Sequence, residues 1–195
     1  MTRARHGRRV PWGPVLMLVF SVVVSGALLQ FDLGSDQGTR RYPTAIGQVG
    51  TLNNGERVVV RSYEVASATT SGTGKVTLTT SDVILVVHLT LEVDTPAEAR
   101  GFAVLLSSGD RRHRGASTLG KLPQPGFRKV TTAVFEIPAE DLAGATVELT
   151  TFDLFRFWDR KVVVDLDISD QQAQELAAYA RTRVVQVEDD REELQ

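Results

Sequence analysis

The sequence predicts an all-β fold, an antiparallel β-sandwich with one N-terminal transmembrane helix and one short C-terminal helix. About seven short segments alternate between apolar and polar residues, and clusters of Gly, Pro, Asn and Ser separate them. An uncharged run near the N-terminus predicts the membrane helix. We expect a cytoplasmic tail at residues 1–9, a membrane anchor at 10–31 and a spacer at 32–48. An extracytoplasmic sandwich with its helix follows at 49–188, and a charged tail at 189–195.

The predicted transmembrane anchor runs from Val10 to Phe31 and contains no Asp, Glu, Lys or Arg. As a helix it is about 33 Å long, enough to cross a hydrocarbon core of about 30 Å. Four arginines lie within residues 1–9. Positively charged flanks stay in the cytoplasm, so we expect a single-pass protein of the plasma membrane with its N-terminus inside and residues 32–195 outside.

A cleaved signal peptide is the alternative interpretation of the same run. The small residues Ser25, Gly26 and Ala27 are typical of a cleavage site, whereas the apolar run continues to Phe31, which favours a retained anchor. Either interpretation takes the domain out of the cytoplasm. The sequence has no cysteine and no Asn-x-Ser/Thr site, which is more typical of a bacterial cell surface than of a eukaryotic secretory route.

Charge and motif content narrow the possible function classes. The net charge is −2, and setting aside the four N-terminal arginines leaves −6 for the rest, whereas nucleic-acid binding requires a basic surface. We therefore expect no nucleic-acid partner. Beyond the predicted anchor the only histidines are His88 and His113, and the G-x-S-x-G, H-E-x-x-H and S-x-x-K motifs are absent. We expect no catalytic residue, no cofactor and no enzyme activity.

The strongest strand signal lies at residues 83–93. The odd-numbered positions place six apolar side chains on one face: Val83, Leu85, Val87, Leu89, Leu91 and Val93. The other face changes from apolar at Ile84 and Val86 to polar at His88 and Thr90, which is typical of a central strand whose second face is half covered. The remaining strand-like segments lie at residues 56–66, 75–79, 102–106, 128–137, 146–152 and 162–168.

The predicted C-terminal helix begins after Ser169. Ser169 and Gln172 have the spacing of a capping box, in which each side chain bonds to the other residue's backbone N–H. Four small or apolar residues then recur at helical spacing and form one stripe: Ala173, Leu176, Ala177 and Ala180. We expect this stripe to pack on the sandwich.

Two segments in the second half of the predicted sandwich carry a family resemblance. A Pro-Gly turn, Leu122-Pro123-Gln124-Pro125-Gly126-Phe127, precedes a strand that ends in Ala133-Val134-Phe135-Glu136-Ile137-Pro138. With the segments at 50–60 and 83–91, the chain over residues 48–168 resembles the exported, membrane-tethered immunoglobulin-like (telokin-like) domains of Gram-positive bacterial surface proteins. The resemblance implies an immunoglobulin-like sandwich outside the membrane, and no particular substrate. The chain departs from the family in two places. After the central strand it has Val93-Asp94-Thr95-Pro96 where the family usually has Asn-Thr or Asn-Gly, and its C-terminal helix extends beyond the common core.

Two groups of side chains are candidate contact sites. The first is a basic loop on an acidic domain, formed by Arg111, Arg112 and Arg114. Its positive charge favours contact with anionic headgroups or wall polymers, and the alternative is an ordinary solvated hairpin tip. The second group is aromatic and lies among charged residues: Phe155, Phe157 and Trp158, close to Phe152. Such aromatic residues are enriched where proteins bind one another, and the alternative is that they close one end of the sandwich.

An acidic motif raises the question of calcium. Asp165, Asp167 and Asp170 form the pattern D-x-D-x-x-D, in which strand alternation places the first two on one face. Calcium prefers carboxylate oxygens but needs six to eight ligands, about twice what three monodentate side chains offer. The alternative is a solvated strand face followed by a carboxylate at a helix N-terminus, and we predict no metal site.

These observations predict a membrane-anchored extracytoplasmic binding or scaffold module that works through protein–protein contact and is not an enzyme. The alternative is an extracytoplasmic sensor or carrier that holds a small molecule or a cell-wall polymer between the sheet and the helix. A pocket with convergent carboxylates favours the carrier, and a flat aromatic patch favours the protein partner.

Overall fold

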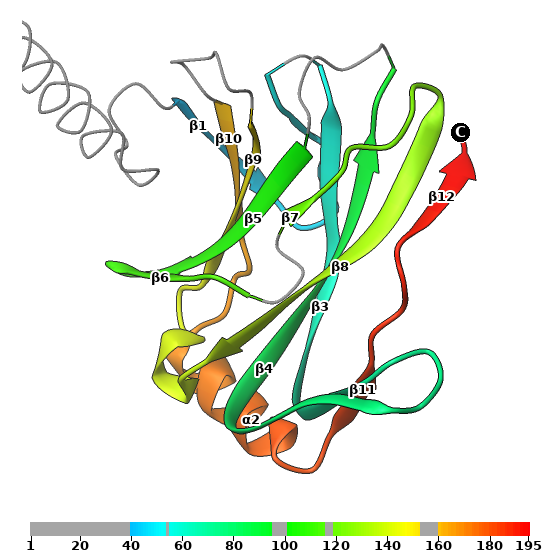
Figure 1. The fold of residues 1–195 in the computed structure, drawn as a ribbon. Coiled ribbons are helices and arrows are strands. Elements are labelled where there is room, and N and C mark those ends of the chain that lie inside the picture. Colours follow the sequence, from blue (N-terminus) through cyan, green and yellow to red (C-terminus); the bar gives the residue numbers. More distant parts are fainter. Residues whose placement is uncertain (1–39, 54, 95–100, 116–118, 153–159) are drawn as a thin grey trace, which may run out of the picture. The chain divides into compact units, whose positions relative to one another are not determined.

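The computed structural model describes residues 40–53, 55–94, 101–115, 119–152 and 160–195. Within them the chain is mostly β-strand and forms two sheets, with one α-helix and one short 3-10 helix (Figure 1). This confirms the predicted all-β class. In this part of the chain no helix is both long and apolar enough to cross a bilayer. The predicted anchor, residues 10–31, and the tail before it lie outside the described residues.

The two sheets have the strand orders β1-β10-β9-β5-β6 and β11-β3-β4-β8-β12. The first sheet is built from β1 (Arg40–Ala45), β10 (Arg160–Asp165), β9 (Thr146–Phe152), β5 (Gly101–Ser108) and β6 (Arg111–His113), with β7 (Leu119–Gly120) paired to β5. The second is built from β11 (Val184–Gln186), β3 (Arg57–Thr70), β4 (Val76–Glu92), β8 (Phe127–Ile137) and β12 (Arg191–Leu194), with β2 (Gly50–Thr51) paired to β3.

The main core lies between the inner faces of the two sheets. Alternate residues of β4 and β8 from the second sheet pack in one buried cluster with residues of β5, β9 and β10 from the first. The predicted inner face of β4 is confirmed, because its odd-numbered residues from Val83 to Leu91 are at most 3% exposed. Gly50 is needed where β2 approaches β10, since a Cβ at this position would lie 2.4 Å from Val162 Cγ1.

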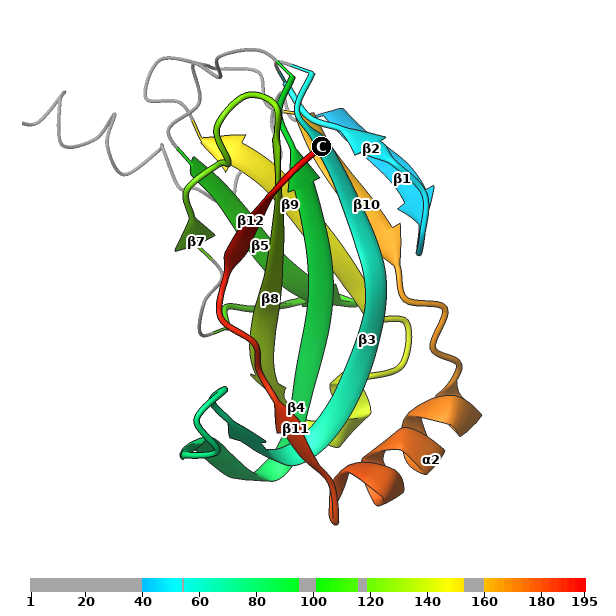
Figure 2. The same cartoon turned by 90° about the vertical axis from the view of Figure 1, so that its right-hand side faces the viewer.

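The outer face of the second sheet carries a smaller apolar cluster, which the chain itself covers. Ala66, Ile84, Val86 and Val134 are buried there together with Val185 from β11. β11 pairs with β3 at one edge of this sheet, and β12 pairs with β8 at the other. The C-terminal segment, residues 181–195, therefore crosses the outer face, as the red trace in Figure 2 shows. The predicted half-covered second face of the central strand is confirmed.

Two predicted boundaries are wrong. The predicted spacer, residues 32–48, includes β1, which pairs in parallel with β10 over six residues from Arg40 to Ala45. The predicted charged tail, residues 189–195, includes β12, which pairs antiparallel with β8. Both strands are short and polar and lie at sheet edges, where one backbone edge and part of each face meet water, so they lack an alternating apolar pattern.

The strand pairing is also not antiparallel throughout, in contrast to the prediction. β1 pairs in parallel with β10, and β11 pairs in parallel with β3. All other strand pairs in the described residues are antiparallel. Each parallel partner joins an edge from a distant part of the sequence, and a local hydrophobic pattern does not encode which distant strand a segment pairs with.

Helix α2 (Asp170–Ala180) confirms the predicted short C-terminal helix. Its capping box is present: Gln172 N donates to Ser169 Oγ at 3.3 Å, and Ser169 N donates to Gln172 Oε1 at 2.9 Å. Ala173 and Ala180 are buried in the main core, and Leu176 and Ala177 pack against it. The helix lies across the end of the fold that also carries the β3–β4 hairpin and the 3-10 helix (Figure 1).

Candidate functional site

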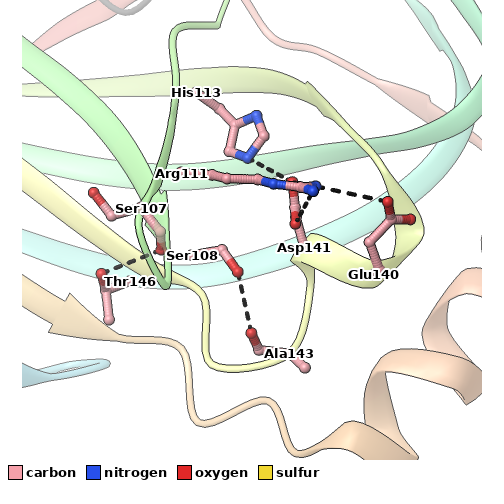
Figure 3. Close-up of polar contacts among 8 residues, drawn as sticks. All are labelled: Ser107, Ser108, Arg111, His113, Glu140, Asp141, Ala143 and Thr146. Carbon is pink, nitrogen blue, oxygen red and sulfur yellow. Dashed lines mark hydrogen bonds and ion pairs between the residues drawn. The ribbon is translucent and has the colours of Figure 1, made fainter.

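The first candidate site is a polar cluster at the turn end of the β5–β6 hairpin, where Arg111 pairs with Ser108 (Figure 3). Its centre is Asp141, the last residue of the 3-10 helix η1 (Ala139–Asp141). Pro138 opens η1, and Asp141 N donates to Pro138 O at 3.0 Å. Leu142, the next residue, is fully buried. The short helix and the buried Leu142 hold Asp141 in place, so that its side chain is 8% exposed and its carboxylate lies against β6.

Arg111 of β6 binds this carboxylate with two hydrogen bonds. Its Nη1 donates to Asp141 Oδ1 at 3.0 Å and to Oδ2 at 3.2 Å, and it lies 3.7 Å from Glu140 Oε1. The hydrogen bond to Asp141 and the charge of that carboxylate raise the pKa of Arg111 above its ordinary value. We call this arrangement the Arg111–Asp141 clasp, because it joins the hairpin to η1 across 30 residues of sequence.

His113 completes the cluster. Its Nε2 lies 3.0 Å from Asp141 Oδ2, an ion-pair distance without the alignment of a hydrogen bond. Ser108, on the same hairpin, donates its hydroxyl to Ala143 O at 3.3 Å rather than to the histidine. A nucleophile activated by histidine needs a hydroxyl within hydrogen-bond reach of the imidazole, so the contacts drawn in Figure 3 fit a structural clasp better than a catalytic one.

All three arginines of the predicted basic loop are exposed at the surface of the hairpin and the residue after it. Arg111 in addition holds Asp141. Figure 1 shows this hairpin projecting from the first sheet. Contact of the loop with an anionic partner stays a prediction, now carried by Arg112 and Arg114.

The aromatic candidates Phe155, Phe157 and Trp158 lie outside the described residues. The strand that precedes them is described. At one end of β9 Phe152 pairs with Gly101, and at the other end Thr146 pairs with Ser107, next to the β5–β6 turn. Phe152 and the basic hairpin are therefore at opposite ends of the first sheet.

A second candidate site is a pocket of about 290 Å³ between β3 and α2, lined by Tyr63, Gln172, Glu175, Leu176 and Tyr179. Burial raises the pKa of Tyr63, and the negative charge of Asp167 raises it further. The alternative function expected from the sequence places a ligand between sheet and helix, but it assigned none of these residues to ligand binding. The signal available was the spacing of Gln172, Glu175 and Tyr179, which places them on one side of a helix.

The acidic motif does not assemble into a metal site. The Asp167 N–H donates to Asp165 Oδ1 at 2.8 Å, and Asp167 has a left-handed backbone with φ of 54°. Asp170 begins α2, where a carboxylate suits the helix dipole. Across the described ranges, no three His, Asp or Glu side chains come close enough together to hold a metal ion.

A third polar group lies on the outer face of the second sheet. His88 Nε2 is 3.0 Å from Glu64 Oε1, and Arg183 donates to the other oxygen of Glu64. Arg183 also donates to Tyr179 Oη at 3.2 Å, so this network ties the end of α2 to β3. Comparison with known proteins adds no assignment, because no family model, no curated protein and no solved structure matches the chain.

Proposed function

We propose that this chain is a membrane-anchored extracytoplasmic binding or scaffold module that acts through protein–protein contact and is not an enzyme. In this proposal the described residues form an immunoglobulin-like β-sandwich, held outside the plasma membrane by a single-pass anchor whose N-terminus is cytoplasmic. The packing of two β-sheets around one core supports the fold. The uncharged run from Val10 to Phe31 with its four preceding arginines supports the location.

The observation that carries the proposal is the projecting β5–β6 hairpin. Arg112 and Arg114 are exposed there, and the Arg111–Asp141 clasp holds the turn end of the hairpin against η1. A binding element held in place before it meets its partner loses little conformational entropy on binding. Exposed arginines on a domain of net negative charge favour a partner with an acidic surface.

Crosslinking in intact cells tests the proposal. A membrane-impermeant crosslinker, followed by purification of the tagged full-length protein and mass spectrometry, should recover one stoichiometric membrane-protein partner. Replacing Arg112 and Arg114 by Gln should lower that recovery strongly, because these side chains supply the positive charge of the contact. Because the reagent stays outside, any crosslink to residues 40–195 also reports that the domain is extracytoplasmic.

The matched control replaces Lys75 and Arg181 by Gln. It removes two positive charges from residues away from the hairpin and should leave recovery unchanged. Equal recovery from both double variants would reject the hairpin as the contact. If crosslinks form only to wall polymer or lipid, the contact is with an anionic surface and not with a protein partner.

One observation favours the second candidate function, an extracytoplasmic sensor or carrier. The pocket between β3 and α2 lies between sheet and helix and has a carboxylate, an amide and two phenol rings in its lining. Concave sites of this kind, with an apolar wall and a few convergent polar groups, are where proteins hold small ligands.

A further inference from the structure

We propose that the pocket between β3 and α2 binds an alkylammonium group, either as a free organic amine or as the side chain of a lysine in a polypeptide. This inference rests on the second candidate function, since it names the ligand class for the carrier pocket. It is independent of the β5–β6 hairpin, whose residues do not line the pocket.

The aromatic walls are the first reason. Tyr63 and Tyr179 come from β3 and α2, and the faces of phenol rings attract cations. The fold already uses one of these rings in this way: the guanidinium of Arg183 lies 5.1 Å from the centroid of the Tyr179 ring. The positive charge of Arg183 is compensated by Glu64, so it opposes a second cation only weakly.

The acidic rim is the second reason. Glu175 lines the pocket, and its Oε1 accepts from Gln171 Nε2 at 3.0 Å, an amide that leaves the negative charge in place. Asp167 acts on Tyr63 through its charge. No cation among the described residues pairs with either carboxylate. A bound ammonium group would donate a charge-assisted hydrogen bond to the Glu175 carboxylate.

Size and apolar lining favour an alkyl stem behind the charge. At about 290 Å³ the pocket is just below the usual range for small-ligand sites, about 300–1,000 Å³. It therefore suits one extended side chain or a short amine. Leu176, which packs against the main core, offers the apolar contact that methylene groups need.

The test uses the full-length protein in detergent micelles and three probes: cadaverine, Nα-acetyl-lysine amide and its uncharged analogue Nα-acetyl-norleucine amide. Calorimetry and saturation-transfer NMR measure their affinities. We expect both ammonium probes to bind, and the norleucine probe to bind at least about tenfold more weakly, equivalent to about 1.4 kcal/mol. A preference for the lysine probe assigns the cation to a polypeptide, and a preference for cadaverine assigns it to a free amine.

Glu175→Gln is the decisive variant, because Glu175 is exposed on α2 and its replacement leaves the core untouched. It should weaken the ammonium probes about tenfold. The matched control Glu188→Gln also removes one negative charge from an exposed residue, but outside the pocket, and should change nothing. Tyr179→Leu, at a residue 55% exposed, should weaken the ammonium probes more than the norleucine probe.

Equal affinity for the lysine and norleucine probes overturns the inference, as does unchanged binding by Glu175→Gln or no binding at all. The crosslinking experiment separates this inference from the protein-contact function. If Glu175→Gln loses the amine but still recovers the crosslinked partner, the two sites act separately. If the Arg112 and Arg114 variant loses the partner but binds the amine normally, the pocket stands without the hairpin.

Discussion

The two faces of the second sheet are covered in different ways. The inner face packs against the first sheet, and its side chains, such as Leu85 and Phe135, are fully buried among other apolar residues. The outer face has a small apolar cluster beneath the C-terminal segment, and ion pairs hold that segment on either side of the cluster. The inner face is thus covered by a whole sheet, and the outer face by a single length of chain.

The difference shows how stability is distributed over the fold. Contacts between two sheets bury large apolar areas, which contribute about 25 cal/mol per Å² removed from water. The C-terminal segment adds one buried valine, Val185, together with ion pairs such as Arg128–Glu193, whose side chains are 38% and 34% exposed. Ion pairs in contact with water contribute little to stability. We expect the inner face to set the global stability and the outer face to open first.

The largest expected effect comes from the inner face. Phe135→Ala should lower the free energy of unfolding by about 3–5 kcal/mol, because it removes a fully buried aromatic ring and leaves a cavity between the sheets. Urea unfolding of the full-length protein, followed by circular dichroism, measures the change. A loss below about 1 kcal/mol would mean that the two sheets do not share this core.

A smaller effect is expected beneath the C-terminal segment. Val185→Ala should cost about 1–2 kcal/mol, since two buried methyl groups are worth about 0.8 kcal/mol each before any cavity term. Val184→Ala is the matched control, because the neighbouring valine is 57% exposed and should change stability by less than about 0.5 kcal/mol. Equal effects of the two substitutions would show that β11 does not cover the sheet.

The smallest effect concerns pH. Burial alone raises the pKa of Asp190, but hydrogen bonds from Lys129 and Thr131 outweigh it and hold the pKa below its ordinary value of 3.8. The hydrogen bond from Arg128 holds the pKa of Glu193 below 4.5. A lowered carboxylate pKa contributes stability that is complete above the ordinary value and is lost as the pH falls through the lowered one.

The melting temperature should therefore fall more steeply from about pH 5 to about pH 3 in the wild-type protein than in a double variant, Asp190→Asn with Glu193→Gln. Thermal melts of both proteins at the two pH values measure this difference. Parallel pH dependence would place both carboxylates in water rather than against β8.

The parts of the fold that local patterns encode were predictable. The central strand showed its buried face through strict alternation, and Ser169 with Gln172 predicted the start of α2. The edge strands β1 and β12 were missed, because polar sequences such as RRYPTA and REEL have no buried face to show. Their pairing depends on partners about 120 and 60 residues away, which no local pattern reports.

The candidate sites were predictable in kind more than in detail. The arginines of the basic loop stood out in the sequence, but the carboxylate that holds Arg111 is Asp141, 30 residues later, with no motif to link them. The pocket brings Tyr63 of β3 to residues of α2 more than 100 positions away. Only the folded arrangement of sheet and helix brings these side chains together.

The edge strands β1 and β12 have a consequence for any attempt to shorten the chain. A fragment cut at residues 49 and 188 would lose both strands and would uncover an edge of β10 in one sheet and of β8 in the other. Rows of unpaired backbone N–H and C=O groups are templates for pairing with another molecule. Such a fragment would expose an unpaired strand edge on each sheet. Its self-association would result from the truncation and would not be a property of the native protein.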